Sequence, residues 1–177
     1  MNITINQEIE KDYNEVESVT EKAFENEKHS DHSEHKLVNR LRKSDAFIPE
    51  LSLVAKDDEK IVGHLMLTKI KIKNDQNEFD SLALAPVSVL PEYQSKGIGS
   101  KLINEALKIS KELGFKSVIV LGHDKYYPKF GFKTASTYDI KAPFEVPDSA
   151  FMALELENDS LKDVNGVVIY SNAFFEQ

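Results

Sequence analysis

The stretch Gln94-Ser95-Lys96-Gly97-Ile98-Gly99-Ser100 decides the fold, because it joins an apolar segment to an amphipathic one. Before it, residues 82–89 (LALAPVSV) are mostly apolar and predict a buried strand. After it, apolar residues recur at helical spacing from Leu102 to Leu113. Two glycines at the start of a helix leave backbone N–H groups uncovered, where the helix dipole also favours negative charge. The stretch therefore predicts a loop that holds a phosphorylated cofactor.

Two common nucleotide-binding motifs do not fit this loop. A Walker loop needs glycine at position 94 and lysine at position 100, where this chain has Gln94 and Ser100. A dinucleotide fingerprint needs a third glycine where Leu102 stands, and its first glycine follows the strand closely. Here residues 90–93 intervene. The remaining alternatives are another phosphorylated ligand or a glycine pair that only caps a turn, and the flanking strand and helix favour the ligand.

The composition is that of a soluble globular protein, with 41% hydrophobic and 29% charged residues. A length of 177 residues suits one domain, which we expect to span 1–177. No apolar run approaches the roughly 20 residues that cross a bilayer, and residues 1–6 lack the features of a secretory signal. The chain has no cysteine, which excludes disulfides and thiol nucleophiles. We therefore expect a cytoplasmic protein without a membrane partner.

The formal net charge of −8 argues against nucleic acid as a partner, because phosphate backbones need a basic surface. The same charge favours cationic ligands such as amines. Lysines nevertheless gather near the loop. Lys108 and Lys111 are expected on a solvated helix face, whereas Lys96 and Lys101 fit either a solvated face or a phosphate site.

The hydrophobic pattern predicts an α/β (α+β) fold with a mixed central sheet of about six to seven strands and helices on both faces. Helices are expected around the apolar residues of 16–24, 37–41 and 102–113, and a short helix and turn within 122–132. A polar turn is expected at 73–80. The predicted strands are residues 3–5, 51–56, 60–72, 82–89, 117–121, 151–156 and 167–170.

Several segments together resemble the GNAT superfamily of N-acetyltransferases. The loop follows Val-x-Pro-Glu-Tyr and reads Gln-x-x-Gly-x-Gly, like the family's acyl-CoA loop. Residues 126–132 (YYPKFGF) resemble its Tyr-x-x-x-Gly-Phe motif, so the core motifs occupy 82–132. Residues 151–156 and 166–170 resemble the ending of a bacterial subfamily of uncharacterised predicted acetyltransferases.

The resemblance implies acetyl-CoA as co-substrate and no metal. Backbone groups of Val87 and Val89 would pair with the pantetheine arm like an added strand, and the Val87 N–H would polarise the thioester carbonyl. Both valine side chains are also ordinary core residues. The remaining cofactor-binding residues would hold the diphosphate: Gln94, Ser95, Lys96, Gly97, Ile98, Gly99 and Ser100.

Tyr127 lies four residues before Gly131, where the resemblance places the acid that protonates the departing CoA thiolate. Tyr126 is the alternative, because the adjacent tyrosines allow a one-residue shift. An amphipathic tyrosine that packs on the short helix is the competing interpretation of Tyr127.

The general base is not assigned by the resemblance. Many relatives carry a glutamate near positions 83–85, where this chain has Ala83-Leu84-Ala85. His64, His123, Glu78 and Asp124 are the nearest candidates by chain position. His123 follows the fifth predicted strand, where family sites open, whereas His64 lies mid-strand, where a structural histidine is more common.

The pattern His29-x-x-His32-x-x-His35 invites comparison with a metal site. Three-residue spacing drifts around a helix, so the side chains would not converge. We predict no metal site and interpret the segment as a polar entry to the second helix, capped by Asp31 or Ser33.

These observations predict an acetyl-CoA-dependent N-acetyltransferase that moves an acetyl group to a primary amine by direct transfer in a ternary complex. The lack of cysteine excludes an acetyl-cysteine intermediate. The alternative is a non-catalytic acyl-CoA-binding sensor or partner subunit, and a longer acyl donor or a hydroxyl acceptor stays open. The acceptor would be a small-molecule or peptide amine, and the sequence is compatible with a homodimer.

Overall fold

Two long antiparallel strands, β3 (Lys60–Lys73) and β4 (Glu78–Val89), form the centre of the computed structural model, which describes residues 1–176. The side chains of β3 are buried from Ile61 to Thr68, because helices cover both faces of this part of the sheet. The register of the two strands shifts between Leu65 and Leu67, where β4 has an extra residue. The hairpin of β3 and β4 is thus the central part of the sheet, and the other strands lie on either side of it.

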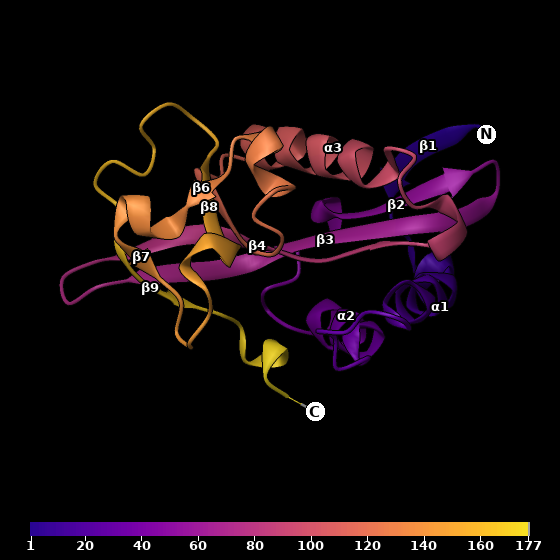
Figure 1. Cartoon of the computed structure of the whole chain (residues 1–177), viewed down its shortest axis with the longest axis horizontal. Helices are drawn as coiled ribbons and strands as arrows, with labels where there is room; N and C mark the ends of the chain where they lie inside the picture. Colours follow the sequence, from indigo (N-terminus) through magenta and orange to yellow (C-terminus); the bar gives the residue numbers. More distant parts are fainter. Residues whose placement is uncertain (177) are drawn as a thin grey trace.

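The described part of the chain forms one nine-stranded mixed sheet (Figure 1). The strand order is β1-β2-β3-β4-β5-β8-β6, while β9 pairs with β7 and with the far end of β3. β4 and β5 are parallel, and α3 connects them. The remaining strands are β1 (Ile3–Gln7), β2 (Ser52–Asp57), β5 (Ser117–Leu121), β6 (Lys133–Thr134), β7 (Ile140–Lys141), β8 (Phe151–Glu155) and β9 (Gly166–Ile169).

Helices cover the two faces of the sheet. α3 (Ile98–Glu112) lies on one face, and α1 (Tyr13–Phe24) and α2 (Glu34–Arg42) lie on the other (Figure 1). α3 packs closely on β3 at Gly63, where an added Cβ would lie 3.2 Å from a methyl group of Leu102. Short 3-10 helices connect the elements: η1 (Glu10–Asp12), η2 (Pro49–Leu51), η3 (Pro91–Tyr93), η4 (Tyr127–Phe130), η5 (Ala135–Tyr138), η6 (Asp148–Ala150) and η7 (Asn172–Phe174).

The predicted fold class, a mixed sheet with helices on both faces, is confirmed. The predicted number of strands was too low, because β6 and β7 have two residues each and such strands leave no hydrophobic pattern. The polar turn predicted at 73–80 is shorter in the structure, where β4 already begins at Glu78. The prediction was too long because exposed residues of a strand are polar, like those of a turn. In residues 1–176 no helix is both long and apolar enough to cross a membrane.

Candidate functional site

β4 and β5 separate from each other halfway along β4. They pair at only two positions, Leu82 with Val118 and Ala83 with Ile119. From there to Val89, β4 keeps its pairing with β3 but has no pairing with β5. β5 meanwhile stays paired with β8 along its whole length. The sheet therefore opens between β4 and β5, and one backbone edge of β4 faces the opening.

The backbone groups of Val87 and Val89 lie on this open edge. The Leu90 N–H donates to the Val62 carbonyl at 2.9 Å, which marks one hydrogen-bonded pair between the end of β4 and β3. Because antiparallel residues alternate between bonded and non-bonded pairs, Val89 and Val87 turn their N–H and C=O groups away from β3. The side chain of Gln94 supports this, since its Nε2 donates to the Val89 carbonyl at 3.0 Å.

The loop at residues 94–100, which the sequence predicts to hold phosphates and which is called the phosphate loop below, lies between the end of β4 and the start of α3. Gly97 is the N-cap of α3 with φ +82°, a left-handed conformation that a glycine adopts without strain. The N–H of Lys101 donates to the Gly97 carbonyl, so the three preceding N–H groups have no carbonyl in the helix to bond. The glycine-containing start of α3 thus leaves backbone N–H groups uncovered.

A cavity of about 380 Å³ lies against this loop. Most of the residues predicted to bind a cofactor line this cavity, but Val87 and Lys96 do not. Val87 lies deeper along β4, and the Lys96 ammonium lies 5.6 Å from the ring centre of Tyr93. The predicted residues that do line the cavity are Val89, Gln94, Ser95, Gly97, Ile98, Gly99 and Ser100.

The opposite wall of this cavity comes from η4 and the residue before it. Tyr126 and Lys129 line the cavity, and the Tyr126 hydroxyl would lie 3.1 Å from a Cβ added to Gly99. Neither residue is among those that the sequence predicts to bind the cofactor. The only sequence signal is their position inside the Tyr-x-x-x-Gly-Phe motif, and the motif does not say which side chains turn toward the loop.

Tyr127 does not line this cavity, and its ring packs beside the end of β5. A Cβ on Gly122 would collide with its ring, so this glycine makes room for the tyrosine. The ring also meets Tyr126 and Phe132 edge-on, with centroid distances of 5.1 and 5.7 Å. Burial, with a smaller contribution from Tyr126, raises the pKa of the Tyr127 hydroxyl to about 12. The hydroxyl thus keeps its proton at neutral pH.

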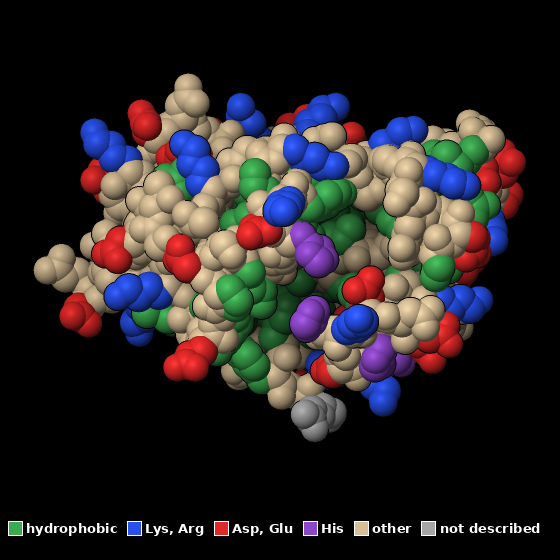
Figure 2. Space-filling model, viewed as in Figure 1, with side chains coloured by type: hydrophobic (Ala, Val, Ile, Leu, Met, Phe, Trp, Pro, Cys, Tyr) green, Lys and Arg blue, Asp and Glu red, His purple; other side chains and the backbone are tan. Residues whose placement is uncertain are grey.

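The side of the molecule shown in Figure 2 has a hollow lined by hydrophobic side chains, between α2 and the segment that carries η4. Histidine side chains lie at both margins of this hollow. His64 is fully buried and does not contribute to this surface. His123 is exposed, and its carbonyl accepts hydrogen bonds from the N–H groups of Tyr126 and Tyr127.

Two candidates for the general base lie in unsuitable places. Glu78 begins β4 at the end opposite the loop, paired with Lys73 of β3. His64 is enclosed in the core, where its Nε2 lies 2.9 Å from the Ser52 hydroxyl. Burial, with a smaller contribution from Arg42, lowers the pKa of His64 to about 3. His123 and its neighbour Asp124 are exposed and follow the end of β5.

The histidines of the 29–35 segment make separate contacts. His32 Nδ1 lies 2.9 Å from the Phe24 carbonyl, and His35 Nε2 lies 3.7 Å from a carboxylate oxygen of Glu21. Throughout residues 1–176, no three His, Cys, Asp or Glu side chains gather as a ligand set for a metal ion. Asp31 accepts hydrogen bonds from the N–H and hydroxyl of Ser33, the N-cap residue of α2.

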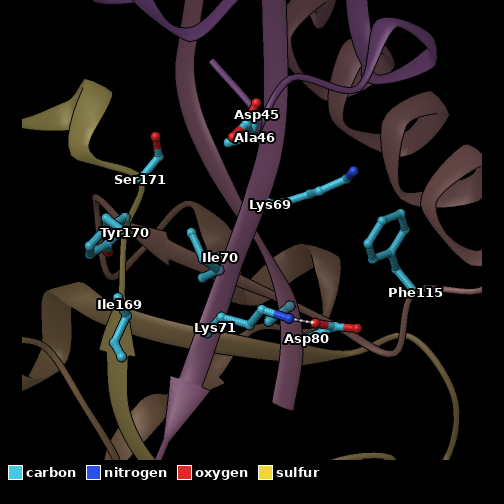
Figure 3. Close-up of a pocket in the computed structure, with 11 residues that line it drawn as sticks. Asp45, Ala46, Lys69, Ile70, Lys71, Asp80, Phe115, Ile169, Tyr170 and Ser171 are labelled. Carbon is cyan, nitrogen blue, oxygen red and sulfur yellow. Dashed lines mark hydrogen bonds and ion pairs between the residues drawn. The ribbon is translucent and has the colours of Figure 1, made fainter. Parts of the chain in front are cut away.

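A larger cavity, of about 570 Å³, lies at the other end of β3 and β4 (Figure 3). Lys69 extends from β3 toward Phe115, while Ile70 points to the other side of the strand, toward Tyr170. Lys71 and Asp80 form an ion pair across the two strands. Eight residues of strand separate Ser81 from Val89, roughly 26 Å. This cavity is therefore remote from the phosphate loop.

Comparison with known proteins identifies the family. Residues 8–132, which include the loop and η4, match the model of the acetyltransferase (GNAT) family. The chain belongs to this family. Among curated GNAT relatives, the uncharacterized N-acetyltransferase YjhQ of Escherichia coli K12 is 34% identical over 138 residues, which cover 77% of this chain and 74% of YjhQ. The uncharacterized N-acetyltransferase YhbS of the same strain is 30% identical over 160 residues, 90% of each chain.

Two solved GNAT structures resemble the whole chain. The structure of E. coli YhbS in complex with CoA superposes with a TM-score of 0.89 at 27% identity, covering 99% of this chain and 93% of YhbS. A GNAT family acetyltransferase from Brucella melitensis in complex with acetyl-CoA gives a TM-score of 0.81 at 34% identity, with 98% of both chains covered. These two neighbours bind CoA and acetyl-CoA, respectively.

Proposed function

We propose that this GNAT protein transfers the acetyl group of acetyl-CoA directly to a primary amine in a ternary complex. The open edge of β4, which ends at the phosphate loop, is the observation that carries the proposal. An extended pantetheine arm would pair with the outward-facing backbone groups of Val87 and Val89 as an added strand, sharing the Val89 carbonyl with Gln94 or displacing the Gln94 side chain from it. Its diphosphate would then reach the uncovered N–H groups of α3. The complexes of the two solved neighbours with CoA and acetyl-CoA support acetyl-CoA as the co-substrate.

The Val87 N–H is the proposed donor to the thioester oxygen. When an amine attacks the thioester, the carbonyl oxygen gains negative charge, and a fixed backbone N–H stabilises that charge without rearranging. Val87 lies beyond the last β4–β5 pair, and its N–H points into the opening. No cysteine is available for a covalent intermediate, so the amine attacks acetyl-CoA itself.

Proton transfer requires two groups. A primary amine with a pKa near 10.4 is free base about once in 2,500 molecules at pH 7, which costs about 4.6 kcal/mol. We assign removal of this proton to His123, directly or through a water molecule, because it is exposed and follows β5 on the side where β5 has separated from β4. We assign protonation of the CoA thiolate to Tyr127, which belongs to the Tyr-x-x-x-Gly-Phe motif and is protonated at neutral pH.

Binding and turnover are tested separately. Calorimetry with acetyl-CoA tests the cofactor, and release of free CoA with a panel of amines tests the reaction. The cysteine-free chain gives no thiol background in a thiol-specific dye assay. Saturable acetyl-CoA binding with amine-dependent CoA release is expected, and a failure to bind acetyl-CoA would refute the proposal.

The second candidate is a non-catalytic acyl-CoA sensor or partner subunit. The alanines at positions 83 and 85 favour it, since no carboxylate stands on β4 beside the opening. Binding of acetyl-CoA without CoA release across the amine panel would support the sensor. Turnover that falls at least tenfold in His123→Gln would instead support the enzyme and the assigned base. A comparison of acetyl-, propionyl- and succinyl-CoA would define the acyl group.

A further inference from the structure

We propose that Lys129 binds the phosphates of acetyl-CoA from the side opposite the loop, and that the Tyr126 ring holds it in position. This inference rests on the proposed function, because it names a second wall of the same cofactor site. The sequence motif assigns only the loop. The geometry adds η4, which follows β5 and approaches the loop from across the cavity.

The contacts of Tyr126 place Lys129 at the cavity. The Tyr126 hydroxyl approaches the first turn of α3, where it would lie 3.1 Å from a Cβ on Gly99. The Lys129 ammonium lies 4.1 Å from the centre of the Tyr126 ring and 5.2 Å from that of Phe130. A cation on an aromatic face is held electrostatically while its remaining N–H donors stay available. Lys129 is thus fixed at the wall and can still donate.

Charge explains why a cation is needed here. The chain carries a formal net charge of −8, and the phosphate groups of CoA are also negative, so the protein as a whole repels them. Within residues 1–176, Lys129 forms no ion pair with a carboxylate, and it is the one lysine among the residues that line this cavity. Its charge is therefore free to interact with a phosphate, as a charge-assisted hydrogen bond.

The position of Lys129 also connects cofactor binding with catalysis. η4 carries both Lys129 and Tyr127, the proposed acid. A phosphate held between the α3 N-terminus and Lys129 would fix η4 against the loop. The Tyr127 ring, which packs between Gly122 and Phe132, would be held with it. Lys129 is accordingly a cofactor-binding residue, and Tyr126 is a positioning residue.

The experiment compares two single-charge variants and two acyl donors. Lys129→Gln removes the proposed contact, and Lys133→Gln on β6 is the matched control, because Lys133 is also exposed but does not line the cavity. Each protein is titrated with acetyl-CoA by calorimetry and assayed with acetyl-pantetheine, which lacks the diphosphate and the 3′-phosphate. Lys129→Arg tests whether another cation restores binding.

We expect Lys129→Gln to raise the Kd for acetyl-CoA about tenfold, the effect of one charge-assisted hydrogen bond. Its KM for acetyl-pantetheine should stay within twofold of the wild type, and Lys133→Gln should bind acetyl-CoA normally. An unchanged Kd in Lys129→Gln would overturn the inference. So would equal weakening with both donors, which indicates a structural effect, or equal weakening in both variants, which indicates a nonspecific charge effect. If the wild type does not bind acetyl-CoA, the proposed function itself fails.

A double-variant cycle tests the role of Tyr126. If Tyr126→Leu acts only by releasing Lys129, then Tyr126→Leu combined with Lys129→Gln should bind acetyl-CoA no more weakly than Lys129→Gln alone. Additive losses would show that the tyrosine contacts the cofactor independently, and the positioning role would be wrong.

Discussion

At the scale of single residues, the adjacent Tyr126 and Tyr127 of the YYPKFGF motif pack against different parts of the structure. Tyr126 turns to the loop, and Tyr127 turns to the end of β5, where Gly122 leaves space for its ring. Adjacent side chains at the start of a short helix diverge, so Tyr126 lines the cavity at the loop and Tyr127 does not. This divergence supports Tyr127, not Tyr126, as the proposed acid.

Tyr127→Phe should lower kcat about 100-fold, the smaller end of what a positioned acid contributes, and leave the Kd for acetyl-CoA within twofold. The ring and its packing are retained, so the folded structure should be unaffected. Steady-state kinetics and calorimetry measure the two effects. Because the pKa of Tyr127 is raised to about 12, the wild-type kcat should show no loss between pH 8 and 10 from this group. Unchanged turnover in Tyr127→Phe would remove it from the mechanism.

At the scale of elements, the start of α3 uses its two glycines for different reasons. Gly97 needs a left-handed backbone and has open space around it, whereas Gly99 lies in the helix facing Tyr126. A side chain at Gly97 therefore strains the backbone, and one at Gly99 fills part of the cavity.

Gly97→Ala should lower the free energy of unfolding by about 1 kcal/mol, the cost of a left-handed non-glycine residue. Gly99→Ala should not destabilise the protein, because alanine favours helix, but it should weaken acetyl-CoA binding severalfold by displacing Tyr126. Denaturant unfolding and calorimetry separate these effects. Normal acetyl-CoA affinity in Gly99→Ala would show that the cofactor does not occupy this part of the cavity.

At the scale of the whole molecule, a buried polar network ties the start of the chain to α2 and the central sheet. Glu8 lies 2.5 Å from the Arg42 guanidinium, and both side chains are almost fully buried. Arg42 also pairs with Glu17 and lies over the Tyr13 ring. Ser52 donates to Glu8 and lies beside His64, so the network reaches β3.

Glu8→Gln should destabilise the protein by about 3 kcal/mol, because it leaves the buried Arg42 charge without its closest partner. Glu157→Gln is the matched control: Glu157 pairs with Lys116 at 2.9 Å, but both side chains are about half exposed. Such a pair contributes less than about 1 kcal/mol. Denaturant unfolding at pH 7 measures the free energy of unfolding of both variants. An equal decrease in the two variants would contradict the role of burial.

His64 makes stability depend on pH. Its pKa is lowered to about 3 in the folded protein, so between about pH 6.5 and pH 3 the unfolded chain binds the extra proton. Above pH 6.5, His64 is neutral in both the folded and the unfolded protein, and it does not reduce the free energy of unfolding. As the pH falls toward 3, the free energy of unfolding decreases by up to about 1.4 kcal/mol per pH unit. His64→Gln should unfold with a shallower pH dependence between pH 4 and 6. The same slope in both proteins would show that other groups cause it.

The chain's own sequence determined the helices, the main strands and the phosphate loop, because hydrophobic period and glycine placement act over a few neighbouring residues. It also indicated the family motif that contains Tyr127. Only the tertiary structure decided that β4 leaves β5 after Ala83, that Tyr126 and Lys129 face the loop, and that His64 is enclosed beside Glu8. Strand-edge pairing, cavity walls and buried ion pairs join residues far apart in the chain, and no local pattern encodes which partners meet.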